Sequence, residues 1–325
     1  MSHRSGRPLS IVRRAGFSPR DRNCTCGTCS IFRGSSGSVP VVRAGESSRP
    51  VSPLGELPRT DIEEIFEQIR ADYEPDVVRQ TAPCRRVIVA QPGAGKSQLM
   101  PVGLDGATRV SGDDFKIYHP GYLGLLAADP RTAGARIRSV YQEWQWRLEE
   151  RVRALRGHLV SENSPGPVCA FLDDLAAFRD DGYRVELVVL AVRRADSRQG
   201  IGLRYADMLR TKAALARFTW VGGHDECFEA VADVLAAVEQ ESAADAVSVV
   251  RRGGAVLHRD ERDTGGRLCG GAVDALLAEQ RRPYTCEEAA AFLVNHERLC
   301  RELPQHRDEW AEVLELAAPL MSPVN

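Results

Sequence analysis

The chain has 325 residues, a formal net charge of -2 and 43% hydrophobic residues. This composition supports one large or two ordinary folded domains and excludes a chain that is disordered throughout. Because there is no basic excess, no apolar run near the ~20 residues of a membrane span and no secretory signal, we expect a cytoplasmic protein with neither nucleic-acid nor membrane partners.

Residues 1–50 differ from the rest of the chain. They hold nine Arg against two acidic residues, a net +7, which leaves -9 for the remainder. The segment is rich in Ser, Gly and Pro and lacks hydrophobic periodicity, so we predict a disordered tail over 1–53. Its Cys24, Cys26 and Cys29 lack the paired spacing of a zinc site, and we favour reduced thiols over a metal centre.

From about residue 60 the pattern alternates between helix and strand. The capping-box signature Thr60-x-x-Glu63 predicts the start of a helix. Helical spacing recurs over 134–156 and 171–179, and short β-branched or apolar runs predict strands at 86–90, 108–111, 159–161 and 184–192. Strands that alternate with helices predict an α/β fold with a parallel sheet.

The last third of the chain has a different pattern. Residues 228–241 form an Ala/Val-rich helical segment, and 247–257 resembles a hairpin with Gly253-Gly254 as its turn. Helices dominate from residue 272, and one opens with the capping box Thr285-x-x-Glu288. We therefore predict an α/β domain over 54–258 and a helical C-terminal extension over 272–325.

A glycine-rich motif follows the strand predicted at 86–90. It matches the phosphate loop G-x-x-x-x-G-K-[ST], except that Ala90 replaces the first Gly. The glycines let successive N–H groups face phosphate oxygens, and a helix starting near Lys96 would add its positive end. Lys96 supplies charge for the outer phosphates, and the Ser97 hydroxyl can ligate Mg²⁺. The expected nucleotide-binding residues are Gln91, Pro92, Gly93, Ala94, Gly95, Lys96 and Ser97.

A second polar cluster, SGDDFKIYHP at 111–120, follows the strand predicted at 108–111. The carboxyl ends of parallel strands face one crevice, so this cluster should lie near the phosphate loop. A carboxylate there could hold Mg²⁺ or accept a proton from an attacking hydroxyl. Alternatively, Asp113 and Asp114 cap a helix that begins at Phe115. Spacing alone leaves both interpretations open.

With these residues the chain resembles the zeta toxin family, whose phosphate loop GQPGSGKT is followed by an N-D-x-F…HP segment. The likeness continues in order through Glu162, GYRVELVVLAV at 182–192, GLRY at 202–205, ARFT at 216–219 and His224-Asp225. It implies a P-loop NTPase-type parallel sheet flanked by helices, and a bacterial kinase that uses ATP or GTP with Mg²⁺. In the best-known members the acceptor is the 3′-hydroxyl of UDP-N-acetylglucosamine, a peptidoglycan precursor, and a small antitoxin occludes the nucleotide site.

The family register implies roles for individual residues. Asp113 aligns with the general base, and Arg204 and Arg217 align with the arginines that neutralise the transferring phosphoryl group. Glu162 aligns with an acidic residue near the metal, so Mg²⁺ is expected on Ser97, with Asp113 or Glu162 joining through water. The residues expected to contact the acceptor are Asp113, Glu162, Ser164 and His119.

Two positions depart from the family pattern. Gly166 stands where an Arg is usual, and the acidic residue of the preceding helix falls on Trp146, with Glu143 and Glu149 one turn away. The nucleotide chemistry therefore looks intact, whereas sugar recognition looks altered. Three interpretations stay open: a kinase for UDP-N-acetylglucosamine, a phosphotransferase for another small hydroxyl compound, and a catalytically weakened nucleotide-binding module that acts through a partner. Regulation in cis by the helices after residue 272 is a further hypothesis.

Overall fold

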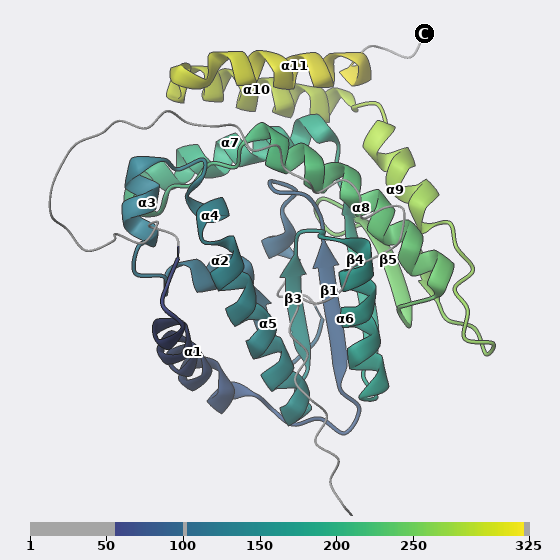
Figure 1. Ribbon diagram of the computed structural model, residues 1–325. Helices are drawn as coiled ribbons and strands as arrows, with labels where there is room; N and C mark the ends of the chain where they lie inside the picture. The colour runs from purple at the N-terminus through teal and green to yellow at the C-terminus, as the bar shows by residue number, and fades with distance from the viewer. Residues whose placement is uncertain (1–55, 100–102, 322–325) are drawn as a thin grey trace, which may run out of the picture. The chain divides into compact units, whose positions relative to one another are not determined.

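The computed structural model describes residues 56–99 and 103–321. The predicted tail and its three cysteines lie outside these residues. Six strands form one sheet in the order β2-β3-β1-β4-β5-β6 (Figure 1). Their bounds are β1 Cys84–Val89, β2 Thr108–Ser111, β3 Leu159–Asn163, β4 Arg184–Ala191, β5 Ala246–Arg251 and β6 Val256–Glu261.

Strands β1 to β5 are parallel, and only β6 runs antiparallel to its neighbour β5. The turn between β5 and β6 uses Gly253 and Gly254, both with positive φ. These features confirm the predicted α/β fold and the predicted hairpin. Because β1 lies between β3 and β4, the chain leaves it to one side through β2 and β3 and to the other through β4 and β5. The crevice at the carboxyl end of β1 is the place where such sheets bind ligands.

Helices account for most of the remaining described residues. Their bounds are α1 Arg59–Tyr73, α2 Gly112–Lys116, α3 Tyr122–Ala128, α4 Ala133–Arg136, α5 Arg138–Leu155, α6 Val168–Asp180, α7 Arg194–Thr211, α8 Val221–Glu241, α9 Ala272–Arg281, α10 Cys286–Glu302 and α11 Arg307–Met321. Single 3-10 turns occur at η2 Glu74–Asp76, η3 Lys96–Gln98, η4 Ala213–Leu215 and η5 Pro304–His306. Within the described residues, no helix combines the length and apolar character needed to cross a bilayer.

The two faces of the sheet are covered differently. One face, with Val87, Val89 and Leu187, packs against side chains of α1, α5, α6, α8 and α9 in the largest core. The other face, with Ile88 and Leu190, meets a smaller apolar cluster that includes residues 99, 104 and 107. Up to residue 99, where the described part of this segment stops, the structure has the 3-10 turn η3 in place of the helix expected from Lys96. Its sequence explains the difference, since a Pro at 101 and a Gly at 103 interrupt any longer helix.

Helix starts were predicted with mixed success. The structure confirms the capping box at Thr285, whose side chain accepts from the Glu288 N–H while the Glu288 carboxylate accepts from the Thr285 N–H. The box at Thr60 is wrong, because α1 already begins at Arg59 after Pro58 and has no side-chain cap. Proline fixes the backbone angle that a helix entry needs, so it replaces the expected hydroxyl cap.

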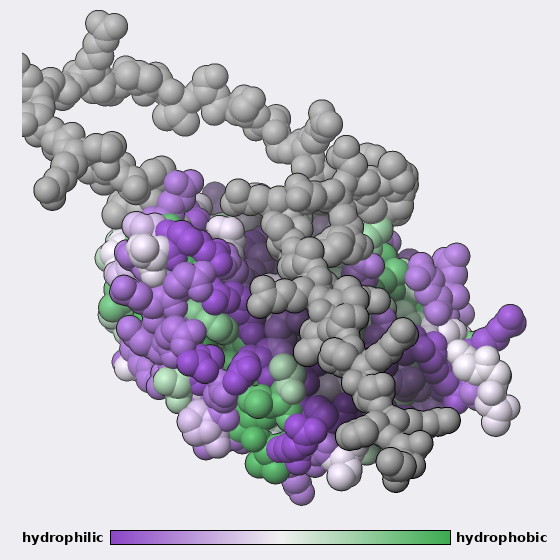
Figure 2. Space-filling model, turned by 60° about the horizontal axis from the view of Figure 1, so that its bottom comes forward, coloured by the Kyte–Doolittle hydropathy of each residue, from purple (hydrophilic) through white to green (hydrophobic). Residues whose placement is uncertain are grey.

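The C-terminal helices α10 and α11 lie on the outer side of α7, which itself crosses above the ends of the strands (Figure 1). The contact is close, because a Cβ added at Gly202 of α7 would lie 2.5 Å from the ring of Trp310 in α11. On the face drawn in Figure 2, hydrophobic residues outside the grey atoms form small separate groups within a hydrophilic surface.

Candidate active site

The phosphate loop connects β1 to η3 and is shaped by two glycines. Gly93 and Gly95 have φ values of +76° and +99°, a region that glycine reaches at little cost. Gly93 also packs directly on α7, because a Cβ there would lie 2.0 Å from the carbonyl oxygen of Ser197. Any larger residue would push the loop away from this helix.

Lys96 lies at the centre of the loop and is buried. Its Nζ donates to the carbonyl oxygens of Ala90, at 2.6 Å, and Gln91, at 3.1 Å. Burial lowers the pKa of Lys96, and the nearby carboxylate of Glu162 opposes that effect. A buried ammonium group that is hydrogen-bonded to neutral carbonyls is well suited to bind an anionic phosphate.

Two side chains hold the loop in place, and only the first of them was predicted from the sequence. Gln91 is fully buried and donates to the carbonyl of Val192, at 3.2 Å, and to the hydroxyl of Ser197, at 3.1 Å. Arg252, in the β5–β6 turn, donates to the carbonyls of Gly93, at 2.6 Å, and Ala94, at 3.1 Å. Gln91 belongs to the predicted motif, but nothing in the sequence separates Arg252 from the many other arginines.

Ser197 continues a buried hydrogen-bond chain. Its Oγ lies 2.8 Å from Nε2 of His224, whose Nδ1 lies 2.7 Å from Oδ1 of Asp225. Burial lowers the pKa of His224, opposed by Asp225. The order of groups is that of a Ser-His-Asp triad, but the Ser197 side chain is fully buried inside α7 and out of reach of a substrate. We therefore interpret the hydrogen bonds that connect Ser197, His224 and Asp225 as a support for Gln91.

Asp113 lies in the first turn of α2, where Ser111 rather than Asp113 caps the helix. Its Oδ1 accepts from Nζ of Lys116 at 2.7 Å, and its Oδ2 accepts from Nη2 of Arg217. Burial acts to raise the pKa of Asp113, but the charges of Lys116, Arg217 and Arg204 outweigh it and hold the pKa below its usual value. The carboxylate is therefore charged, and its side chain is still 35% exposed.

Arg204 and Arg217 reach the same region from different elements. Arg204 lies on α7, and its Nη2 makes only a long hydrogen bond, 3.5 Å, to Oγ1 of Thr219. Within the described part of the chain its buried Nε meets no acceptor. Burial and then the charge of Arg217 lower the pKa of Arg204. Arg204, Arg217 and Lys96 thus converge where few carboxylates balance their charge. This arrangement favours an anionic ligand.

The other predicted site residues lie at the edge of this cluster. Glu162 is the next-to-last residue of β3, and burial raises its pKa against the opposing charge of Lys96. Ser97 and Ser164 are exposed. His119 is buried and accepts the Gly121 N–H on its Nδ1 at 3.1 Å, so it stabilises the turn into α3. The electrostatic contacts thus bring together Asp113, Arg204, Arg217, Lys96 and Glu162.

Helix α5 presents Gln145 to this site. The Oε1 of Gln145 would lie 3.0 Å from a Cβ built at Gly112, the residue before Asp113. The Nε2 of Gln145 donates to Oδ1 of Asn163 at 3.0 Å. Trp146, which the sequence register assigned to this place, is 45% exposed. Gln145 rather than Trp146 is therefore the α5 side chain that the contacts place beside Gly112, and the position that the family register assigned to Trp146 stays a prediction.

Glu149 does not take the place of the missing acidic residue either. It is buried one turn after Gln145 and accepts from Nη2 of Arg85 at 2.9 Å. Burial raises the pKa of Glu149 to about 7, although Arg85 opposes the shift. Asp174 accepts from the same nitrogen of Arg85 at 2.6 Å, so the Glu149 carboxylate belongs to an internal ion cluster.

Comparisons with known proteins bear on the family and the fold of this chain. The family model described as zeta toxin matches residues 68–263. A solved chain from the PezAT chromosomal toxin–antitoxin system of the human pathogen Streptococcus pneumoniae superposes with a TM-score of 0.65 at 16% identity, covering 77% of this chain and 99% of that one. A chain of the AvrRxo1-ORF1:-ORF2 structure with ATP gives a TM-score of 0.47 at 14% identity, covering 81% and 87%. None of the curated proteins matches the chain.

Proposed function

Because this chain belongs to the zeta toxin family of kinases, we propose that it transfers the γ-phosphate of ATP or GTP to a sugar hydroxyl, the 3′-hydroxyl of UDP-N-acetylglucosamine. In this proposal it acts in the cytoplasm as a toxin-like inhibitor of cell-wall synthesis. The observation that carries the proposal is the buried Lys96 inside a left-handed glycine loop, close to Arg204, whose buried Nε meets no acceptor within the described residues.

On the donor side, the loop N–H groups and Lys96 would bind the phosphates. Arg204 has a buried Nε ready to donate, so it can follow charge as it develops on the transferring group. An arginine in this role contributes about 10³–10⁵ in rate in other phosphotransferases. The exposed hydroxyl of Ser97 and the carboxylate of Glu162 fit Mg²⁺, which prefers a few oxygen ligands together with substrate phosphates and water. When bound, the metal would supply neutralisation of phosphate charge.

On the acceptor side, Asp113 would receive a hydrogen bond from the attacking hydroxyl. Lys116 and Arg217 each hold one of its two oxygens, which fixes the orientation of the carboxylate and leaves further lone pairs for the acceptor. Its lowered pKa makes it a weak base. A weak base suffices for a loose transition state, in which the hydroxyl needs positioning more than early deprotonation.

The test is a phosphotransfer assay with ATP or GTP, Mg²⁺ and UDP-N-acetylglucosamine. We expect Asp113→Ala and Lys96→Met to lose at least about 10²-fold in kcat. The matched control for Lys96 is Lys212→Met, because Lys212 is exposed at the end of α7. Variants as active as wild type would overturn the assigned roles, and no transfer to this sugar by wild type would overturn the acceptor.

A second acceptor class is favoured by the residues around Asp113. Gln145 is the side chain next to Gly112, and nothing lies within 4 Å of a Cβ built at Gly166. A neutral amide and an open position suit another small hydroxyl compound. Transfer to a mixture of sugar nucleotides and polyols, but not to UDP-N-acetylglucosamine, would support this alternative.

A small antitoxin that covers the nucleotide site is the partner that we propose.

A further inference from the structure

The segment between η4 and α8 links two catalytic groups through one aromatic ring. Phe218 is buried and lies between Arg217, which donates to Asp113, and Thr219, which accepts from Arg204. The Phe218 N–H donates to the carbonyl of Pro130 at 3.1 Å. Any shift of Phe218 therefore moves the partners of both arginines.

Phe218 is held mainly by residues from the end of the chain. The ring of His306, in η5, stacks on it with centroids 4.8 Å apart and planes 8° apart. Trp310 of α11 approaches with a centroid distance of 6.2 Å, and Tyr205 of α7 meets it edge-on at 5.3 Å. The guanidinium of Arg131 lies 4.6 Å from the Phe218 centroid.

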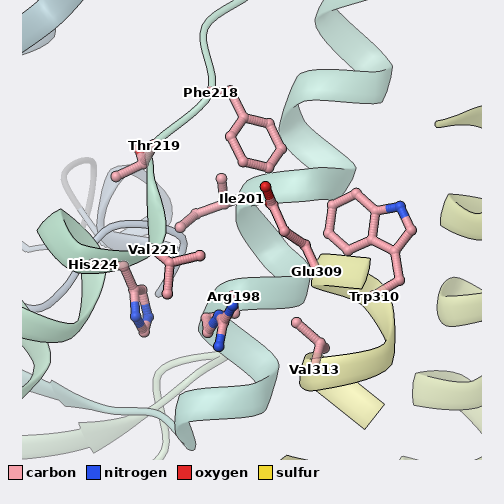
Figure 3. A pocket seen from close by; sticks show the side chains of 9 residues that line it. All are labelled: Arg198, Ile201, Phe218, Thr219, Val221, His224, Glu309, Trp310 and Val313. Atoms are coloured by element: carbon pink, nitrogen blue, oxygen red, sulfur yellow. The ribbon is translucent and has the colours of Figure 1, made fainter. Parts of the chain in front are cut away.

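The same C-terminal residues are fixed to the kinase core by charge. Arg131 pairs with Glu309 and donates to Nδ1 of His306 at 2.6 Å. Arg198 of α7 pairs with Glu312 at 2.8 Å. Figure 3 shows these layers around a small pocket: Phe218 and Thr219 come from the catalytic segment, Ile201 and Arg198 from α7, and Glu309, Trp310 and Val313 from α11.

We propose that the C-terminal helices are a positioning element of the catalytic site: His306 and Trp310 fix Phe218, and Phe218 sets Arg217 and Thr219. This inference rests on the proposed kinase function. It differs from regulation in cis by a cover, because α10 and α11 pack behind α7 and not across the phosphate loop (Figure 1). Positioning matters here, since a displacement of ~1 Å at a reacting group can cost ~10²-fold in rate.

The test compares His306→Ala with His306→Phe in the full chain. The first variant removes the stacked ring, and the second keeps a flat ring on Phe218. We expect His306→Ala to lower kcat about tenfold or more while the Kd for nucleotide stays within about twofold, because the phosphate loop lies elsewhere. His306→Phe should recover most of the lost kcat. His296→Ala is the control, since it removes a stacked His from the neighbouring helix α10, at Phe292.

A second measurement separates this inference from the proposed function. Hydrogen–deuterium exchange at the Phe218 amide, which donates to Pro130, should rise in His306→Ala and remain unchanged at the phosphate loop. An unchanged Phe218 exchange, or a kcat equal to wild type, would overturn the positioning role. Equal losses of nucleotide binding in His306→Ala and His296→Ala would also overturn it. An inactive wild type would refute the kinase assignment, and the exchange experiment would still decide the positioning.

Discussion

Gly93→Ala should separate the phosphate loop from α7. The added Cβ would lie 2.0 Å from the carbonyl oxygen of Ser197 and 2.9 Å from the backbone nitrogen of Ile201. Ordinary carbon–oxygen contact needs well over 3 Å, and the obstacle is helix backbone that cannot rotate away. The loop must therefore move by about 1 Å or more, and Lys96 moves with it.

The cost has two parts that a control can separate. A left-handed φ of +76° costs Ala about 1–2 kcal/mol relative to Gly, and overpacking against a rigid helix adds about 1–3 kcal/mol. Gly253→Ala is the matched control, because Gly253 has φ +96° and nothing lies within 4 Å of its Cβ position. The gain from a stiffer unfolded chain is the same in both variants and cancels.

We expect the free energy of unfolding of Gly93→Ala to fall by about 1–3 kcal/mol more than that of Gly253→Ala. Chemical denaturation measures this difference, and titration calorimetry with ATP or GTP measures binding. Affinity should drop by at least about tenfold in Gly93→Ala, equivalent to about 1.4 kcal/mol, and stay near wild type in Gly253→Ala. Equal stability and equal affinity in the two variants would refute the claim that close packing on α7 sets the loop.

Three further predictions concern charge around the site. Arg252→Met removes the donor to two loop carbonyls and should weaken nucleotide binding about tenfold by calorimetry, whereas the exposed Arg259→Met should not; equal affinities would contradict this. The pKa of Asp113 lies below its usual 3.8, so it should contribute no acidic limb to kcat between about pH 5 and 8, and Asp113→Asn should be inactive throughout that range. The pKa of Glu149 is raised from 4.5 to about 7 in the folded protein, so protonation of this side chain favours the folded state. This contribution to the free energy of unfolding is complete below pH 4.5 and is lost as the pH rises through 7. Glu149→Gln should therefore flatten the fall in unfolding free energy over this range, and parallel denaturation curves would exclude the assignment.

Much of the sheet could be predicted because most of its strands, namely β1, β3, β4 and β5, are short, largely buried runs bounded by turn residues. Predicted strands at 108–111 and 184–192 coincide with β2 and β4 to within a residue. The phosphate loop followed from its own glycine-rich motif after a strand. The convergence of Asp113 with two distant arginines followed from a family register, which carries spatial information that periodicity lacks. The prediction that a helix starts at Thr60 with a side-chain cap was wrong, because α1 already begins at Arg59, directly after Pro58.

Other features depend on tertiary contacts that leave no local trace. Lys116 has a hydrogen bond to Asp113 three residues away, a spacing that helices allow but do not require. Arg252 contacts the loop only because the β5–β6 turn lies beside it. The prediction of a helix after Lys96 was wrong. It rested on the phosphate-loop motif and gave too little weight to the following Pro and Gly, which disfavour a helix. The proposed domain boundaries stay predictions.

The 3-10 turn after Lys96 has a consequence for the order in which the chain acquires its activity. A loop followed by a long helix would be ordered by its own neighbourhood. Here Gln91 bonds Val192, 101 residues onward, and Gly93 bonds Arg252, 159 residues onward. Contacts of such high sequence separation form late, since the intervening chain must be ordered first. We therefore expect the growing chain to bind nucleotide only after β5 and the turn that carries Arg252 have emerged.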